Sequence, residues 1–253
     1  MKFYAFIPAR YGSSRYPGKP LMKIAGKMMI QHVYERSCCY KGFSDVFVVT
    51  DDERISNAVF GFGGKAIISE YEHMSGTDRI YEAVCKLGFN DEDIIVNIQG
   101  DQPVFDLRII DSLLEPFNSD TAVSVVTVGF RITNTCDIEN SNNVKTVINK
   151  EGYALYFSRS IIPYDRDRQN NVTYFKHLGF YAYSMKALEK FSTSPVGTLE
   201  FIEKLEQLRF LENSIPIRFV ETSYDSPEVD CPEHIDNIER FLMGADEKNR
   251  LIQ

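Results

Sequence analysis

Short apolar, β-branched and aromatic runs recur along the chain, separated by polar or turn-forming segments. Such runs predict β-strands, here over Phe3–Ile7, Val46–Thr50, Ala66–Ile68, Ile94–Ile98, Ala122–Val128, Val144–Ile148, Ala154–Phe157, Leu178–Tyr183 and Ile217–Val220. Between the early runs, apolar residues return with the period of a helix. This period predicts helices over Met29–Cys39, Glu53–Phe60, Asp78–Leu87 and Leu107–Phe117.

Strands that alternate with helices indicate an α/β fold with a mainly parallel central sheet. From about Val128 to Tyr183 the pattern changes to strands with few helices. We expect an antiparallel β insertion at about 128–183, suited to a lid or a subunit contact. Two amphipathic helices are expected after it, over Leu199–Leu211 and Glu233–Leu242. Because no linker interrupts the pattern, residues 1–253 are expected to form a single domain.

Composition and charge narrow the function classes. The formal charge of −8 over 253 residues argues against general nucleic-acid binding, which needs a broad cationic surface. The five cysteines include no C-x-x-C pair, so neither a disulfide framework nor a zinc site is predicted. The first apolar run ends at Pro8, and no apolar stretch is long enough to cross a bilayer. We therefore expect a cytoplasmic protein without membrane insertion.

The loop from Pro8 to Pro20 carries three cations, Arg10, Arg15 and Lys19, directly after the first predicted strand. In open α/β sheets, ligands bind at the carboxyl ends of the strands. Arginine forks and a lysine ammonium suit phosphate oxygens, and glycines in the loop permit close backbone approach. The alternative is a solvated loop with incidental cations. The position favours a triphosphate site that serves nucleotidyl transfer.

Two acidic residues are candidate metal ligands. Asp101 follows the strand Ile94–Ile98, where a hard oxygen ligand would suit the Mg²⁺ carried by a nucleotide. It could equally be a turn residue or a helix cap. Asp230 lies just before a predicted helix, where an acidic residue is favourable without any metal. Asp230 becomes a candidate ligand only if it faces Asp101.

Other polar residues admit both functional and structural interpretations. Ser75, Gly76 and Thr77 could hydrogen-bond a base edge, although Thr77 taken alone is expected to cap the helix that follows. The second half of the chain contains a scattered set of polar residues. Each of them taken alone is usually structural, but arginine pairs suit the carboxylate of an acceptor substrate. This set contains Arg159, Arg166, His177, Tyr181, Glu206 and Gln207, with the last two expected on the helix Leu199–Leu211.

A family resemblance is carried by six segments that occur in order: Ile7–Pro20, Ser75–Arg79, Asn97–Asp101, Tyr153–Arg159, Lys176–Gly179 and Leu205–Arg209. Together they resemble the 3-deoxy-manno-octulosonate (Kdo) cytidylyltransferases, or CMP-Kdo synthetases, from Phe3 to about Phe241. The resemblance implies a Rossmann-like nucleotidyltransferase fold and a homodimer formed through the inserted β region. It also implies transfer of CMP from CTP to the anomeric hydroxyl of Kdo, with Mg²⁺, giving CMP-Kdo and pyrophosphate for lipopolysaccharide synthesis.

The resemblance also implies residue roles by position. Arg10, Arg15 and Lys19 would hold the triphosphate, and Ser75 and Gln99 would help to read cytosine. Asp101 and Asp230 would bind Mg²⁺, so Arg10, Lys19, Asp101 and Asp230 form the implied catalytic set. The acceptor would contact Arg159, Arg166, His177, Tyr181, Glu206 and Gln207. No dedicated general base is evident.

Departures from the family pattern leave the acceptor open. Gln102 stands where many members have Glu, Cys231 stands where Thr is usual, and the stretch from Arg168 to Lys176 is short. These features resemble a branch that acts on 8-amino-3,8-dideoxy-manno-octulosonate (Kdo8N). Two other classes of protein are alternatives. A non-catalytic nucleotide-sugar-binding protein would have lost the carboxylates or loop cations, which are retained, and a sugar-phosphate pyrophosphorylase would need a phosphate site for its acceptor.

Overall fold

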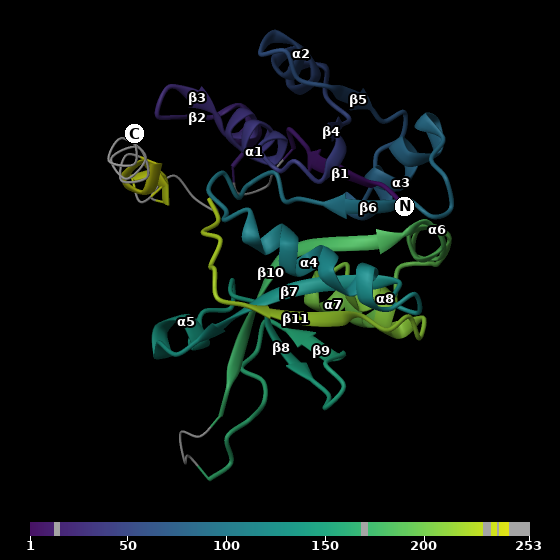
Figure 1. Cartoon of the computed structure of the whole chain (residues 1–253). Helices are drawn as coiled ribbons and strands as arrows, with labels where there is room; N and C mark the ends of the chain where they lie inside the picture. The colour runs from purple at the N-terminus through teal and green to yellow at the C-terminus, as the bar shows by residue number, and fades with distance from the viewer. Residues whose placement is uncertain (13–15, 168–171, 230–233, 237, 243–253) are drawn as a thin grey trace. The chain divides into compact units, whose positions relative to one another are not determined.

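A computed structural model describes most of the chain, namely residues 1–12, 16–167, 172–229, 234–236 and 238–242. The chain divides into two compact units (Figure 1). The first comprises residues 1–89, 95–107 and 226–253, and the second comprises residues 90–94 and 108–225. The predicted nucleotide-binding residues fall in the first unit, and the predicted acceptor-binding residues fall in the second.

The first unit contains a parallel sheet in the order β6-β1-β4-β5. Its strands are β1 (Phe3–Ala9), β4 (Phe43–Thr50), β5 (Ala66–Ile68) and β6 (Ile94–Asn97). The β1–β4 and β4–β5 pairs are parallel, and the Ile98 N–H beyond β6 donates to the Phe6 carbonyl at 2.9 Å. All four β6 residues are buried. The carboxyl ends of these strands carry Arg10, Asp51 and Asp101.

Helices of the first unit pack on this sheet. They are α1 (Met29–Cys38), α2 (Glu53–Gly61) and α3 (Gly76–Leu87). A 3₁₀ turn, η1 (Lys19–Leu21), and a small hairpin of β2 (Lys23–Ile24) and β3 (Lys27–Met28) connect β1 to α1. The hairpin and the C-terminal segment share a small core in which Ile24, Met29, Val104, Val229 and Ile238 are buried.

The second unit is built mainly from antiparallel pairs. It contains β7 (Val125–Ile132), β8 (Lys145–Ile148), β9 (Ala154–Ser158), β10 (Tyr174–Ser184) and β11 (Arg218–Thr222). The pairs β7–β10, β8–β10 and β8–β9 are antiparallel, while β11 runs parallel to β7. Helix α4 (Arg108–Ser119) contacts β7 and β11. A mainly parallel sheet with an antiparallel region confirms the predicted α/β class.

One predicted helix is wrong. Residues Leu199–Leu211 form two short helices, α7 (Thr198–Glu203) and α8 (Leu208–Glu212), because Lys204 adopts a left-handed φ of 56°. Arg209 makes two 2.7 Å hydrogen bonds to the Glu200 carboxylate, and both residues are buried. Nine residues of continuous helix would separate them by about 13 Å. The buried ion pair therefore requires the chain to fold back.

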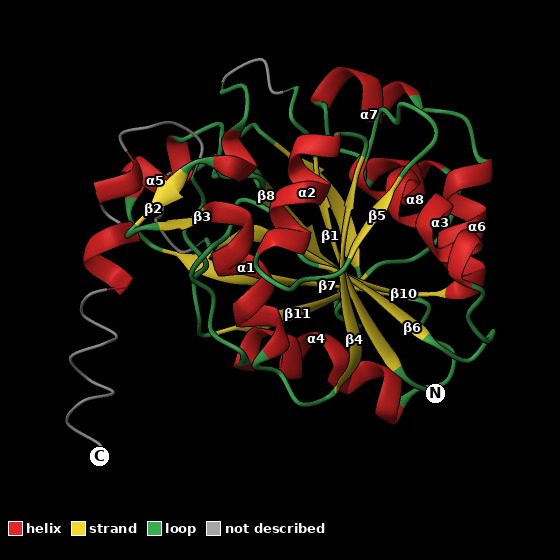
Figure 2. Cartoon of the chain, turned by 90° about the horizontal axis from the view of Figure 1, so that it is seen from above, coloured by secondary structure: helices red, strands yellow, loops and turns green. Residues whose placement is uncertain are grey.

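Two short helices were not predicted, and one prediction is partly covered. Helix α5 (Thr135–Glu139) is capped by Asn134, and α6 (Met185–Thr193) is capped by Ser184. Residues 235–236 and 238–242 are helical, as expected for the last segment, and residue 234 forms a 3₁₀ position before them, while positions 233 and 237 of that prediction lie outside the described residues. Among the described residues, no helix is long and apolar enough to cross a membrane. Figure 2 shows the helices and strands from a second direction.

Candidate active site

The cationic loop after β1 is closed by its own backbone. The Gly18 N–H donates to the Tyr11 carbonyl at 2.9 Å, and Gly18 takes a left-handed φ of 73° that suits glycine. This turn starts η1 at Lys19 and aims the lysine back toward the sheet. Arg10 lies exposed at the end of β1. Arg15, the third predicted cation, lies outside the described residues.

Lys19 and Asp101 meet although they are 82 positions apart in the chain. Lys19 Nζ donates to Asp101 Oδ2 at 2.7 Å, and the two side chains are 12% and 33% exposed. Asp101 reaches this place because Gly100 passes closely over β1, where an added Cβ would lie 2.9 Å from the Pro8 carbonyl oxygen. The structure thus joins one predicted phosphate ligand to one predicted metal ligand.

The segment that leads to Asp230 also reaches Asp101. The Val229 N–H donates to the Asp101 carbonyl at 3.0 Å, and Gln102 Nε2 donates to Glu228 Oε1 at 3.1 Å. Asp230 and Cys231 themselves lie outside the described residues. Gln102 is fully buried, so this departure from the family pattern forms part of the contact between the two segments. The two chain regions predicted to hold a metal are therefore neighbours.

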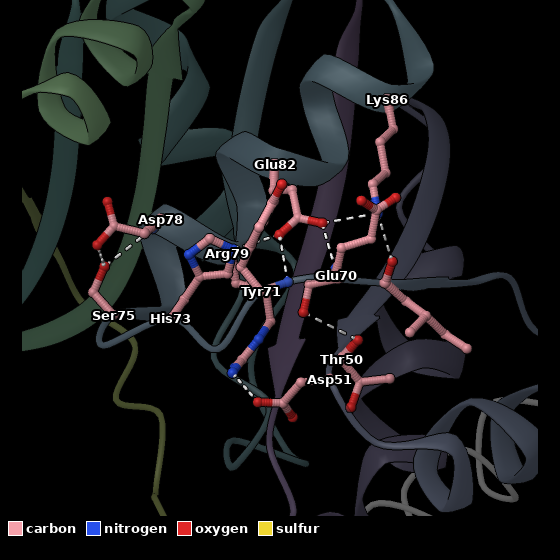
Figure 3. Close-up of polar contacts among 12 residues, drawn as sticks. Thr50, Asp51, Glu70, Tyr71, His73, Ser75, Asp78, Arg79, Glu82 and Lys86 are labelled. Carbon is pink, nitrogen blue, oxygen red and sulfur yellow. Dashed lines mark hydrogen bonds and ion pairs between the residues drawn. The ribbon is translucent and has the colours of Figure 1, made fainter.

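Ser75 caps α3, and the capping role considered for Thr77 is wrong. The Ser75 hydroxyl accepts from the Asp78 N–H at 3.0 Å and donates to Asp78 Oδ2 at 2.7 Å. Thr77 is the second residue of α3 and is fully buried. Ser75 is also predicted to read the base, and Figure 3 shows its hydroxyl directed at Asp78. Gln99, its predicted partner, is half-buried after β6.

An ion pair that the sequence interpretation missed lies at the end of β4. Arg79 Nη2 donates to Asp51 Oδ2 at 2.6 Å, with side chains 4% and 27% exposed (Figure 3). Burial lowers the pKa of Arg79, the Asp51 charge raises it, and the charge of Arg10 lowers it. Arg10 therefore acts electrostatically on the buried Arg79. The position of Asp51 directly after a strand was the signal that could have identified it.

Hydrogen bonds to Glu82 of α3 hold the loop that precedes Ser75. The Glu82 carboxylate accepts from the Glu70 N–H at 2.6 Å, from His73 Nε2 at 2.6 Å and from Lys86 at 2.8 Å (Figure 3). Burial opposes ionisation, but the hydrogen bonds from Lys86, Glu70 and His73 outweigh it and lower the pKa of Glu82 to about 2. The anionic Glu82 thus fixes the position of the loop that leads to Ser75.

In the second unit, His177 and Tyr181 lie together on β10. Their ring centroids are 5.2 Å apart, and His177 Nε2 lies 3.0 Å from the Thr127 hydroxyl oxygen. Burial lowers the pKa of His177 to about 3, so its ring is neutral at neutral pH. Burial raises the pKa of Tyr181, and the charge of Glu206 raises it further. His177 can therefore form hydrogen bonds with an acceptor substrate, but it offers that substrate no positive charge.

Arg159 follows β9 and is held by carbonyl groups. Its Nε donates to the Glu203 carbonyl at 3.0 Å and its Nη1 donates to the Ser141 carbonyl at 3.2 Å. Its backbone N–H donates to the Glu203 carboxylate at 3.1 Å. Within the described part of the chain, no carboxylate forms an ion pair with the Arg159 guanidinium. The guanidinium is thus held by neutral acceptors.

The remaining predicted acceptor residues are less closely grouped. Glu206 and Gln207 lie in the connection between α7 and α8 rather than on a helix, so that placement was wrong. Gln207 is buried, and Arg166 is exposed in the connection between β9 and β10. The described contacts link Glu206 to Tyr181 through its charge but do not link Arg166 to the other members.

Comparison with known proteins decides the family. A family model described as cytidylyltransferase matches residues 4–220. The chain belongs to the cytidylyltransferase family. A 3-deoxy-manno-octulosonate cytidylyltransferase of Desulfatibacillum aliphaticivorans is 51% identical over 96% of this chain and 99% of its own length. An 8-amino-3,8-dideoxy-manno-octulosonate cytidylyltransferase of Shewanella baltica is 48% identical, also over 96% of this chain and 99% of its own length.

A solved structure supports the same family. A CMP:2-keto-3-deoxy-manno-octonic acid synthetase complexed with CTP matches with a TM-score of 0.89 and 42% sequence identity. The match covers 97% of this chain and 100% of that one. This likeness confirms the predicted nucleotidyltransferase fold, and the chain is an enzyme of the cytidylyltransferase type.

Proposed function

We propose that this cytidylyltransferase transfers CMP from CTP to the anomeric hydroxyl of Kdo, forming CMP-Kdo and pyrophosphate. The observation that carries the proposal is the meeting of Lys19 and Asp101 at 2.7 Å, with the Val229 N–H on the Asp101 carbonyl. This contact supports the proposal because Lys19 is the cation assigned to phosphate and Asp101 is the carboxylate assigned to the metal. The names of the Desulfatibacillum relative and of the CTP-bound neighbour support the choice of substrates.

Kdo8N is the alternative acceptor. The Shewanella relative named for this amino sugar is 48% identical, which is close to the 51% of the relative named for Kdo. Both acceptors offer the same carboxylate and the same anomeric hydroxyl, so the chemistry of transfer is unchanged. The choice between them rests on contacts with the substituent at the eighth carbon.

The triphosphate is assigned to Arg10, Lys19 and, by position, Arg15. The Lys19 ammonium forms an ion pair with Asp101. A triphosphate offers Lys19 a stronger anion, and the released Asp101 carboxylate can then serve a cation. On nucleotide binding, Lys19 would hold the triphosphate and Asp101 would hold the metal in place of their mutual contact. Ser75 and Gln99 are assigned to the cytosine.

Mg²⁺ is proposed with Asp101 and Asp230 as its ligands. No group of three metal-binding side chains occurs among the described residues, so the donor set is not complete there. Asp101 fits the ion because its carboxylate is a hard oxygen donor, is one-third exposed, and lies beside the Val229 backbone that precedes Asp230. Bound magnesium would stabilise charge on the α-phosphate and help to orient the attacking oxygen.

The acceptor is assigned to Arg159, Arg166, His177, Tyr181, Glu206 and Gln207. Because His177 is neutral, the acceptor carboxylate is assigned to an arginine, and His177 and Tyr181 are assigned to sugar hydroxyls. Nucleotidyl transfer depends mainly on positioning and charge stabilisation, so no protein general base is invoked.

The first test compares two Asp→Asn variants. Asp101→Asn should lower kcat by at least about a hundredfold while changing CTP affinity much less, because one of the two proposed Mg²⁺ ligands is lost. Asp45→Asn is the matched control, since it breaks a Lys–Asp pair of 2.5 Å with Lys65, removes the same charge and lies within β4. The assay is pyrophosphate release from CTP that depends on the sugar acid. Near-normal kcat in Asp101→Asn would remove the metal assignment.

The cellular and assembly features are proposed on the same basis. We place the reaction in lipopolysaccharide synthesis and in the cytoplasm, where CTP is available. The β-rich region at about 128–183 is proposed to serve both acceptor binding and formation of a homodimer. Light scattering on the purified protein would test the dimer, and a monomer at working concentration would count against it.

A further inference from the structure

A buried lysine in the second unit has no role in the reaction described above. Lys145 lies on β8 with none of its surface exposed, in register with Ser158 of β9. Its Nζ donates to three backbone carbonyls, those of Asn140 at 2.9 Å, Asn143 at 2.6 Å and Arg159 at 2.8 Å. An ammonium group has three donors, so all are used. Every donor of the Lys145 ammonium is thereby bonded, which holds it in one place, while burial, together with the charge of Arg159, lowers its pKa.

These three bonds connect Lys145 to Arg159 and to a loop that Arg159 contacts. One of them holds the Arg159 carbonyl directly. The other two hold the carbonyls of Asn140 and Asn143, which flank Ser141 in the loop between α5 and β8. The Ser141 carbonyl accepts from Arg159 Nη1 at 3.2 Å. One ammonium group therefore fixes both the backbone of Arg159 and the loop that orients its guanidinium.

Glu203 also holds Arg159 in place. Its carboxylate accepts from the Ser158 hydroxyl at 2.6 Å and from the Arg159 N–H at 3.1 Å, and its carbonyl accepts from Arg159 Nε. Long arginine side chains lose much rotamer freedom when they are held, which normally weakens binding. A guanidinium that is already oriented before the ligand arrives avoids that cost.

We propose that Lys145 is a positioning residue that orients Arg159 for the acceptor carboxylate. The proposal rests on the proposed function, because it takes Arg159 as an acceptor ligand. Lys145 itself touches no substrate and acts only through Arg159 and the loop 140–143. Its loss should therefore weaken acceptor binding and leave the nucleotide site, which lies in the first unit, unaffected.

The test uses Lys145→Met, which keeps an unbranched apolar stem but removes the ammonium group with its three donors. Thr146→Val is the matched control, because Thr146 is also buried on β8 and donates to the Tyr156 carbonyl at 3.0 Å without touching Arg159. Lys145→Met should raise the KM for the sugar acid by about tenfold, since oriented charge-assisted hydrogen bonds are lost. The KM for CTP should stay within about twofold, and Thr146→Val should resemble the wild type.

A double variant separates positioning from a general loss of structure. In an Arg159→Met background, Lys145→Met should add less than about twofold to the KM for the sugar acid, because the residue it orients is gone. Where Lys145→Met yields no folded protein, Lys145→Gln replaces it in the same comparison, since its amide retains donors for the loop. An equal rise in both backgrounds would overturn the proposal.

Two other results would also overturn the proposal. One is a KM for the sugar acid in Lys145→Met that matches the KM in Thr146→Val. The other is an unchanged KM for the sugar acid in Arg159→Met, which removes Arg159 as an acceptor ligand while leaving the reaction intact. Failure of the proposed function is distinct, because the wild type would then release no pyrophosphate with CTP and either sugar acid.

Discussion

Replacing Asp51 by Asn tests how the carboxyl end of β4 is held. The change leaves Arg79, only 4% exposed, without its counter-ion. At 2.6 Å, and with an effective dielectric constant of about 20, the pair gains roughly 6 kcal/mol of Coulomb energy, most of which offsets desolvation. Removing one partner of a buried pair costs about 3–5 kcal/mol. Since Asp51 is 27% exposed and Asn keeps an acceptor oxygen, we expect about 2–3 kcal/mol.

The neighbouring residue provides the control. Asp52 pairs with Arg54 at 2.6 Å, but the Arg54 side chain is 59% exposed, and Asn at position 52 can still cap α2. Asp52→Asn removes the same charge and should cost less than about 0.5 kcal/mol. The free energy of unfolding is measured in urea for both variants at neutral pH. If both variants lose the same free energy of unfolding, burial does not distinguish the two ion pairs and the reasoning is refuted.

Three further predictions concern pH and packing. The pKa of Glu82 is lowered from 4.5 to about 2, so its contribution of about 3 kcal/mol is present above pH 4.5 and is lost as the pH falls toward 2. Glu82→Gln should flatten this part of the stability curve, and an unchanged acid slope would contradict the assignment. The His177 ring, with a pKa of about 3, should show no NMR titration between about pH 5 and 8, whereas a midpoint near 6.5 would show that it is solvated. Gly100→Ala should cost about 1–3 kcal/mol and lower kcat, because its Cβ would lie 2.9 Å from the Pro8 carbonyl oxygen. Wild-type stability in that variant would show that the close approach is not required.

The sheet could be predicted because its strands carry strong local signals. Fully buried parallel strands such as β6 are continuous apolar runs, and turn residues end them. The proximity of the loop after β1 to Asp101 could be predicted for a related reason, since both follow strands of one sheet, at whose carboxyl ends ligands collect. Lys19 and Asp101 came together as that rule requires.

The misses depend on contacts between residues distant in the sequence. The break at Lys204 follows from the buried pair of Glu200 and Arg209, and helical periodicity does not report such a pair. Ser75 and Thr77 are both suitable N-cap residues and lie two positions apart, so the sequence alone did not distinguish which of them begins α3. The three carbonyls around Lys145 are backbone groups, which leave no mark in the sequence. Local patterns therefore predict elements better than they predict polar networks.

The central claim is tested most directly by measuring pyrophosphate release over a grid of nucleotides and acceptors. CTP, UTP, GTP and dTTP are each paired with Kdo, Kdo8N and sugar phosphates in the presence of Mg²⁺. The account predicts rapid release only with CTP and a sugar acid, and the preferred sugar acid then distinguishes Kdo from Kdo8N. Release with sugar phosphates instead, or none with CTP and either sugar acid, would contradict it.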